Sequence, residues 1–198
     1  SASERVWRSV RRGEMRVLIK AERADDILRA LDLSHEYGLS TILLGAAEGH
    51  VVARELADSE IPVFLGPLTT QPSSFEHLRA RYENAAILNR AGVPLAFRTG
   101  SAHSSRGLRV SAGVAVAHGL PWEAAMKALC HGAWAALGQP NEGVLEVGAE
   151  AHLVVSSGDP IQPRQSVERV VISGVETSMM TRQRRLYEHF RVLDERIR

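Results

Sequence analysis

The sequence predicts an α/β fold in which four strand-helix units form a parallel sheet, followed by a small β region and a C-terminal helix. Two observations predict it. Short apolar runs alternate with segments of helical periodicity up to residue 140, an order typical of parallel sheets buried on both faces. Beyond residue 140, short apolar runs are separated by turn residues, as in antiparallel sheets. We therefore expect three parts, at residues 1–140, 141–177 and 178–198.

Each of the four units begins with a short apolar run and continues into a helix. The first strand is "MRVLIKA", and the helix "RADDILRALDLSHEYG" follows with apolar residues at helical spacing. In the second unit "STILLGAAEG" precedes "HVVARELADS", and in the third "IPVFLGPL" precedes "SFEHLRARYENAAILNRAG". The fourth strand, "VPLAFRTG", precedes two helices, "LRVSAGVAVAHG" and "PWEAAMKALCHGAWAALG". Pro121 suits the first turn of the last helix.

The second part of the chain predicts short antiparallel strands. In "NEGVLEVGAEAHLVVSSGDP", residues 144–145 are expected to pair across a turn at Gly148 with residues 153–155. The segment "SVERVVISGVET" adds a strand at residues 167–172 and a turn at residues 173–174. In the third part, apolar residues at spacings of four, three and four predict an amphipathic helix. These residues are Leu186, Phe190, Leu193 and Ile197.

Composition and charge exclude several kinds of partner. The chain has 24 basic and 23 acidic residues, a formal charge of +1, so no strong basic field points to nucleic acid or an anionic membrane. No apolar run approaches the roughly 20 residues of a transmembrane helix, and the sequence does not open like a signal peptide. The single cysteine, Cys130, cannot form an internal disulfide and is predicted to be a buried thiol. We expect a cytoplasmic protein.

Polar residues after the predicted strands are the candidate site residues, because the carboxyl ends of parallel strands meet at one edge of a sheet. The stretch "PLAFRTGSAHSSRG" at residues 94–107 shows the pattern most clearly, since an apolar run breaks there into a polar loop. Glycine stands at the end of that strand, at Gly100. The candidate pocket residues are Glu22, Glu48, His50, Thr99, His103 and Arg106.

These segments together resemble a known family. The order "ENAAILNRAGVPLAFRTGSAH", "LRVSAGVAVAHGLPWEAAMKALCHGAWAALG", "NEGVLEVGAEAHLVVSSGDP" and "VERVVISGVET" is similar to the C-terminal half of the amidohydrolase superfamily, in particular its imidazolonepropionase-like members. The resemblance extends over roughly residues 13–177. It implies the C-terminal half of a (β/α)8 TIM-like barrel, with trailing strands of a small β-sandwich and then the C-terminal helix.

The resemblance also implies a chemistry, the metal-assisted hydrolysis of carbon-nitrogen bonds in small, often cyclic, substrates. In that family a divalent ion lowers the pKa of bound water, and an Asp at the end of the eighth strand orients or deprotonates this water. The metal is held by a His-x-His pair on the first strand and by a His on each of the fifth and sixth strands. The resemblance places Lys20 at the fifth-strand His, Gly45 at or beside the sixth-strand His, and Gly100 at the Asp.

Neither glycine nor a protonated lysine can bind a metal ion. We therefore expect no cofactor in this chain, and zinc or another divalent metal only if a partner supplies ligands. A displaced metal site built from Glu22, Glu48, His50 and His103 is an alternative to exposed loop residues. Lys20 is open to three interpretations: a structural ion pair with Glu22, a surface lysine, or a Schiff-base or general-base lysine.

Four strands of an eight-stranded barrel leave two sheet edges and an apolar face to be covered. The sequence therefore predicts an N-terminal-half polypeptide as partner, or self-association that completes the barrel. The leading hypothesis is an amidohydrolase-like subunit that has lost its metal ligands and is noncatalytic by itself. The first alternative is part of a metal-dependent hydrolase that is active only with its N-terminal-half partner. The second is a module that binds a small-molecule ligand without turnover.

Overall fold

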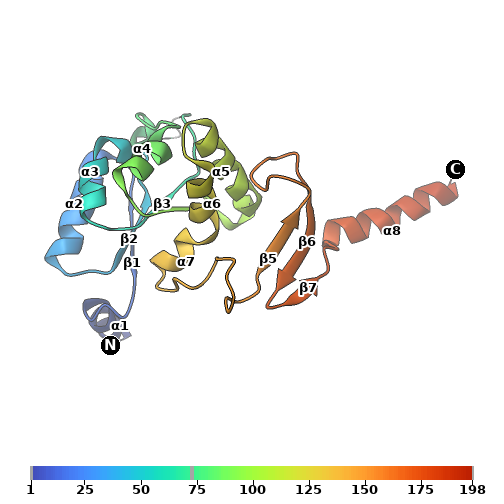
Figure 1. The fold of residues 1–198 in the computed structure, drawn as a ribbon, viewed down its shortest axis with the longest axis horizontal. Coiled ribbons are helices and arrows are strands. Elements are labelled where there is room, and N and C mark those ends of the chain that lie inside the picture. Colours follow the sequence, from blue (N-terminus) through green and yellow to red (C-terminus); the bar gives the residue numbers. More distant parts are fainter. Residues whose placement is uncertain (1, 72–73, 198) are drawn as a thin grey trace. The chain divides into compact units, whose positions relative to one another are not determined.

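The computed structural model describes residues 2–71 and 74–197 (Figure 1). It contains two compact units. The first comprises Ser1–Ala149 and Ile161–Pro163, and the second comprises Glu150–Pro160 and Arg164–Arg198. The first unit holds a parallel sheet with its helices, and the second holds an antiparallel sheet and the last helix. The predicted mixed α/β class, with one sheet of each kind, is confirmed.

The parallel sheet has four strands in the order β1-β2-β3-β4, so the sequence order is also the spatial order. Every neighbouring pair is parallel. The strands are β1 (Val17–Ala21), β2 (Thr41–Gly45), β3 (Val63–Leu65) and β4 (Leu95–Phe97). Each lies within one of the four apolar runs, and β1 and β4 form the two edges of the sheet.

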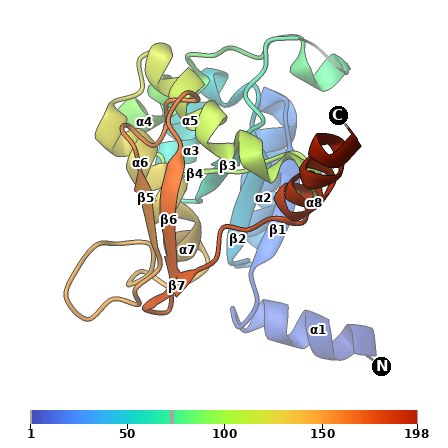
Figure 2. The same cartoon turned by 90° about the vertical axis from the view of Figure 1, so that its right-hand side faces the viewer.

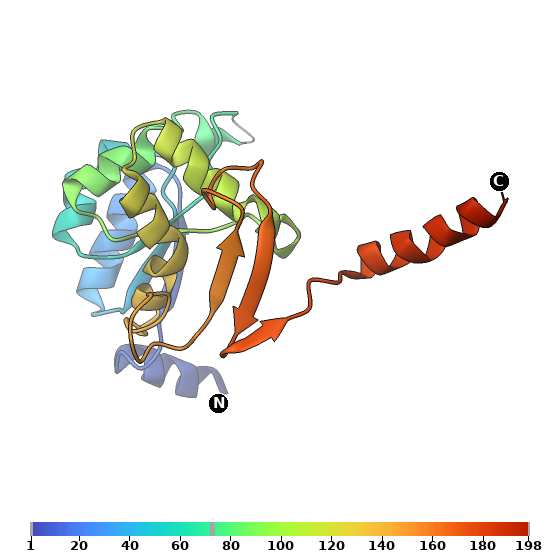
Figure 3. The same ribbon diagram turned by 45° about the vertical axis from the view of Figure 1, so that its right-hand side comes forward.

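The helices of the first unit follow the strands in the predicted alternation. They are α1 (Ala2–Arg11), α2 (Ala24–Glu36), α3 (Ala53–Asp58), α4 (Asn84–Ala91), α5 (Leu108–Ala117), α6 (Trp122–Cys130) and α7 (Gly132–Ala136). Short 3-10 turns lie at η1 (Gly49–Val51), η2 (Phe75–His77) and η3 (Ala102–Gly107). Helix α4 lies beside α5, and α5 beside α6 (Figure 3). Helix α1 was not predicted from the sequence, although Val6, Trp7 and Val10 have helical spacing.

The core lies between one face of the parallel sheet and the helices. The register places Ala21, Gly45, Leu65 and Phe97 on that face. All four are buried. Ala21, Leu65 and Phe97 join buried apolar residues of α2 to α6 in one cluster. On the opposite face Leu18 of the edge strand is 55% exposed, and Lys20 is exposed as well.

Two predicted helices are divided in the structure. The helix expected over residues 74–92 is present only as η2 and α4, with a loop between them. The helix expected over residues 121–138 is interrupted at His131, between α6 and α7. At the start of α7 a side chain on Gly132 would overlap the Leu95 carbonyl oxygen of β4, so glycine permits this close approach. The exposed Cys130 at the end of α6 corrects the prediction of a buried thiol.

The second unit contains three antiparallel strands in the order β5-β6-β7 (Figure 2). They are β5 (Leu153–Ser156), β6 (Val167–Ile172) and β7 (Val175–Thr177). The predicted turn between β6 and β7 is confirmed, with positive φ at Ser173 and Gly174 as in a type I′ hairpin turn. The hairpin expected from residues 144–145 is wrong, because those residues form no strand and β5 pairs instead with β6.

The predicted C-terminal helix is present as α8 (Arg182–Ile197). Its apolar residues Leu186 and Phe190 are exposed, at 46% and 60%. The predicted apolar positions Leu193 and Ile197 fall outside the residues whose side chains the structure describes. In the described part of the chain, no helix combines the length and the apolar character that crossing a membrane requires.

Candidate functional site

A cavity of about 210 Å³ lies at the carboxyl ends of the four parallel strands. Its lining comes from all of them: Lys20 and Glu22 from the end of β1, Gly45 from β2, the segment 65–69 from β3, and Arg98 and Gly100 after β4. The segment before α4 completes the wall. The three positions singled out in the sequence, Lys20, Gly45 and Gly100, therefore meet at one cavity.

Gly45 packs directly against the Glu22 side chain in this cavity. A Cβ atom built on it would overlap the carboxyl carbon and both oxygens of Glu22. The backbone of Gly45 also has a φ of +101°, which an L side chain rarely adopts. The Glu22 carboxylate thus occupies the space that a side chain at position 45 would need.

The Glu22 carboxylate is held there by neighbours on two sides. The Ala47 N–H donates to Glu22 Oε2 over 3.2 Å. His77 Nε2 lies 3.8 Å from Glu22 Oε1, and His77 Nδ1 lies 2.9 Å from the Ser74 hydroxyl. Only 9% of the Glu22 side chain is exposed. Because a buried carboxylate without partners is costly, these contacts explain why Glu22 takes this position.

Lys20 and Glu22 do not form the ion pair that the sequence favoured. Both residues are described, and no contact between their charged groups falls within 4.0 Å. Glu22 turns back over Gly45, whereas Lys20 is exposed on the edge strand β1. The pKa of the Glu76 carboxyl is lowered mainly by its hydrogen bond with Ser74, and the nearby Lys20 cation makes the smallest contribution. The structure thus places Lys20 as a surface lysine at the cavity mouth.

Glu48 and His50 do not line the cavity. Glu48 is buried, and its Oε2 accepts the Ala24 N–H over 3.1 Å at the start of α2. A carboxylate in this position accepts a hydrogen bond from an otherwise unpaired helix N–H group, and the positive end of the helix dipole stabilises its charge. The pKa of His50 is lowered, first by burial and then by the nearby cations of Arg81 and Arg79.

The polar loop after β4 also turns away from the cavity. The Thr99 hydroxyl donates to the Ser101 carbonyl oxygen over 3.0 Å, so it is used within the loop. His103 and Arg106 are exposed on η3, and neither lines the cavity. Of the stretch at residues 94–107, only Arg98 and Gly100 reach the cavity wall.

The wall residues not predicted from the sequence include four with charged, imidazole or amide side chains: His77, Arg81, Asn84 and Arg98. Asn84 is 2% exposed, and its Nδ2 donates to the Ala46 carbonyl oxygen over 2.8 Å. Its Oδ1 has no hydrogen-bond partner among the described residues. The prediction placed His77, Arg81 and Asn84 inside the helix expected over residues 74–92, and no spacing indicated that they reach the strand ends. Arg98 directly follows β4, and this position was the available signal.

The donor set of the cavity does not fit a zinc ion. Zinc in catalytic sites takes three protein ligands from His, Cys, Asp or Glu, and the cavity wall offers only Glu22 and His77. Across residues 2–71 and 74–197, no three such side chains converge on a point that could hold a metal ion. We therefore derive no chemical step through a metal in this chain.

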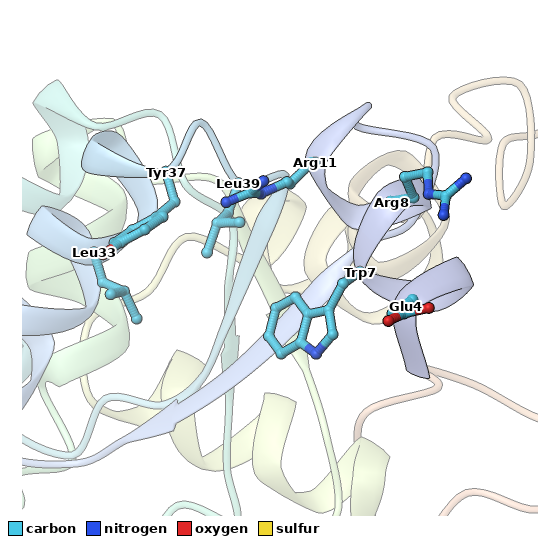
Figure 4. Close-up of a pocket in the computed structure, with 7 residues that line it drawn as sticks. All are labelled: Glu4, Trp7, Arg8, Arg11, Leu33, Tyr37 and Leu39. Atoms are coloured by element: carbon cyan, nitrogen blue, oxygen red, sulfur yellow. The ribbon is translucent and has the colours of Figure 1, made fainter. Parts of the chain in front are cut away.

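A second hollow, of about 510 Å³, lies between α1 and α2 (Figure 4). Its wall is largely apolar, with Trp7 facing Leu33 and Tyr37 across the space and Arg8 and Arg11 at the α1 side. None of the residues predicted from the sequence lines it. It lies away from the strand ends and contributes nothing to the site described above.

Comparisons with known proteins indicate a family. No protein-family model matches the chain, and no curated protein matches it. Among solved structures, an amidohydrolase from Thermotoga maritima aligns over 90% of this chain with 32% sequence identity and a TM-score of 0.85. Molinate hydrolase aligns over 88% with 20% identity and a TM-score of 0.64. Atrazine chlorohydrolase from Arthrobacter aurescens, complexed with zinc, aligns over 91% with 18% identity and a TM-score of 0.56.

The chain spans about half the length of the structures it matches, namely 47%, 46% and 49% of those three chains. The matches below 25% identity show the fold alone, whereas the Thermotoga maritima protein is also similar in sequence. The similarity to the Thermotoga maritima amidohydrolase supports the amidohydrolase superfamily for the part of that protein which this chain spans.

Proposed function

We propose that this chain is the C-terminal half of an amidohydrolase-like (β/α)8 barrel that has lost its metal ligands and is noncatalytic by itself. Within the superfamily we assign it to the imidazolonepropionase-like group. The half-length matches support this proposal, as does a parallel sheet of four strands with two open edges. We propose the cytoplasm as its location, because a lone cysteine suits a reducing compartment.

The position of Glu22 over Gly45 is the observation on which the proposal depends. In the family that the sequence resembles, a metal-binding His stands at or beside this position on the sixth barrel strand. Here a His at position 45 would have to displace a buried carboxylate that the Ala47 N–H group holds in place. The loss of a ligand at this strand end is therefore built into the packing around it.

Gly100 differs from Gly45 in this respect. A Cβ on Gly100 would lie 3.5 Å from the Pro67 ring, an ordinary contact, and Gly100 has no left-handed φ. A side chain would fit there, yet none is present to orient or deprotonate a water molecule. With a lysine, a glycine and another glycine at the three strand ends, the chain itself supplies no activated nucleophile in our proposal.

For the covering of the open edges we propose a separate polypeptide that supplies the N-terminal half of the barrel. The exposed Leu18 on the edge strand β1 supports this, because an edge strand with an exposed apolar side chain is a surface on which further strands add. The exposed apolar residues of β5 to β7 support it independently, since an antiparallel sheet this small needs a second layer. Self-association is the competing outcome.

The proposal is tested with zinc titration and hydrolysis assays on the purified chain. Calorimetry with ZnCl2 should show no site of defined stoichiometry, and a panel of small cyclic amides and ureas should be turned over no faster than in buffer. The same assays with EDTA serve as the control. Stoichiometric zinc binding together with hydrolysis that EDTA abolishes would overturn the noncatalytic assignment and favour a metal-dependent hydrolase of carbon-nitrogen bonds.

A further inference from the structure

We infer that the cavity at the strand ends binds a small free molecule carrying a carboxylate or phosphate group. The inference deepens the proposed function, and it rests on that function only in treating the cavity as a binding site without turnover. Three cationic side chains line the cavity, and they come from three separate segments: Lys20 from β1, Arg81 from the loop before α4, and Arg98 after β4. One carboxylate, Glu22, faces them.

The Glu22 carboxylate does not neutralise these cations in the structure. Its Oε2 accepts the Ala47 N–H, and its Oε1 faces His77 rather than an arginine or lysine. No contact within 4.0 Å joins Glu22 to the charged group of Lys20, Arg81 or Arg98, all of which the structure describes. Three cations and one carboxylate therefore line the wall, and Glu76, which lies outside the wall, is near Lys20 alone among the three cations.

The two arginines have donors to spare. The Nη1 group of Arg98 donates to the Gly66 carbonyl oxygen over 3.1 Å. This bond holds the guanidinium against the loop after β3. Arg81 is paired loosely with Glu83, at 3.8 Å between two half-exposed side chains, and such a pair contributes little. A guanidinium has five N–H donors in a planar fork that matches a carboxylate or a phosphate. An oxyanion would use the donors that remain.

The electrostatics of a neighbouring group agree with this geometry. The pKa of His50 is lowered partly because Arg81 and Arg79 disfavour a further positive charge there. Arg81 and Arg79 thus act on this histidine more strongly than the Glu48 carboxylate, which acts in the opposite direction, in a chain whose formal charge is only +1. A positive cavity in a nearly neutral chain concentrates small anions at that place.

The volume limits the size of the ligand. At about 210 Å³ the cavity is smaller than the roughly 300 Å³ or more typical of sites for drug-sized molecules. Apolar wall residues Leu65, Pro67 and Leu68 lie on the β3 side. This combination suits a short organic acid, whose carbon atoms contact the apolar wall, or inorganic phosphate alone.

The test is to titrate the chain at low ionic strength with succinate and, separately, with inorganic phosphate. Binding is measured by NMR or by calorimetry. Succinamide, of the same size but neutral, is the matched ligand control. We expect saturable binding of at least one anion and none of succinamide. Succinate binding without phosphate binding assigns an organic acid, and the reverse assigns a phosphate group.

Variants locate the site. Arg81→Gln and Arg98→Gln should each weaken binding about tenfold or more, since each removes a charge-assisted hydrogen bond. Arg54→Gln, on the exposed face of α3, is the matched protein control and should leave affinity within about twofold. Thermal melts of all variants establish that they remain folded. Lys20→Met, on an exposed edge position, provides a second reading if Arg98→Gln unfolds, and it should also weaken binding.

Absence of saturable binding for both anions would overturn the inference. Binding that Arg81→Gln, Arg98→Gln and Lys20→Met all leave unchanged would also overturn it, because the anion would then sit elsewhere. Neither result bears on the proposed function, which fails separately if zinc binding and EDTA-sensitive hydrolysis are observed.

Discussion

The parallel and the antiparallel sheet of this chain differ in how much of their apolar surface is covered. On the helix-facing side of the parallel sheet, Leu43 and Val63 are fully buried and Leu65 is 1% exposed. In the antiparallel sheet, the register places Val154, Val170, Ile172 and Val175 on one face. Three of these four are 51–68% exposed. One sheet receives its cover from the helices that follow each strand, whereas the other shows apolar side chains on its surface.

The difference shows which sheet has its apolar face covered by its own helices and which does not. In a strand-helix unit the helix that follows the strand packs on the sheet, so the parallel sheet forms its core with helices that are close in sequence. An antiparallel sheet of three short strands depends on a second layer, and isolated exposed apolar faces of this kind mark places where other polypeptide packs. The exposed Leu18 at the β1 edge shows the same condition at one border of the parallel sheet.

The largest expected effect is a difference in the free energy of unfolding between a variant of the parallel sheet and a variant of the antiparallel sheet. Leu65→Ala should lower the free energy of unfolding by about 2–5 kcal/mol, because it leaves a cavity in the core. Val175→Ala, at a position 68% exposed, should change it by less than about 0.5 kcal/mol. Urea denaturation of both variants measures this. Equal losses in the two variants would mean that the antiparallel sheet is covered after all.

The next effect concerns the two glycines of the cavity. Gly45→Ala should destabilise the chain by about 1–3 kcal/mol, because it forces a strained φ and displaces the Glu22 carboxylate. Gly100→Ala is the matched control and should stay within about 0.5 kcal/mol, since only the Pro67 ring lies near. Thermal unfolding of both variants gives the comparison. Adding Glu22→Ala to Gly45→Ala should recover part of the loss, and no recovery would contradict the overlap.

A smaller effect is expected at the start of α2. Glu48→Ala should cost about 0.5–2 kcal/mol, because the Ala24 N–H group loses its acceptor. Glu55→Ala, on the exposed side of α3, is the control in which an acidic residue is removed without losing a buried hydrogen bond. Denaturant titration compares the two, and similar values for both would show that Glu48 does not act as a helix cap.

The smallest effect is a pH dependence at His50. Its pKa in the folded chain lies below the ordinary histidine value of 6.5, first because of burial and then because of Arg81 and Arg79. As pH falls below 6.5, the unfolded chain binds a proton at this site before the folded chain does. The contribution of His50 to stability is therefore fully present above pH 6.5, and it is lost as the pH falls from 6.5 to the pKa of the folded chain. His50→Gln should show less of this decrease in unfolding measurements between pH 7 and 5, whereas identical pH profiles would exclude His50 as its source.

Much of the fold could be predicted from the sequence. The apolar runs fixed the places of β1 to β4, and "SVERVVISGVET" indicated β6 and the turn before β7. The hairpin predicted from residues 144–145 was wrong. The segment "GVLEVG" has the alternation of a strand but no paired partner among the described residues. Strand β5 pairs instead with β6, which follows after a longer loop. Helical periodicity did not reveal the break at His131, which depends on the approach of Gly132 to β4.

The site was predictable to a lesser degree. Parallel strands bring their carboxyl ends together, so Lys20, Gly45 and Gly100 were expected at one place and do line one cavity. The direction in which Glu22 turns, and the inclusion of Arg81 and His77, depend on loop conformation. Loop conformation follows from contacts that are distant in sequence, and no spacing rule reports it.

Native mass spectrometry of the protein isolated untagged from its own cells tests the central claim most directly, because one spectrum reports chain stoichiometry, partner mass and bound metal. Our account predicts a complex in which this chain is joined by a second polypeptide of similar size, with no divalent ion bound. A complex containing stoichiometric zinc would contradict the noncatalytic assignment, and a lone monomer would contradict the proposed completion of the barrel by another chain.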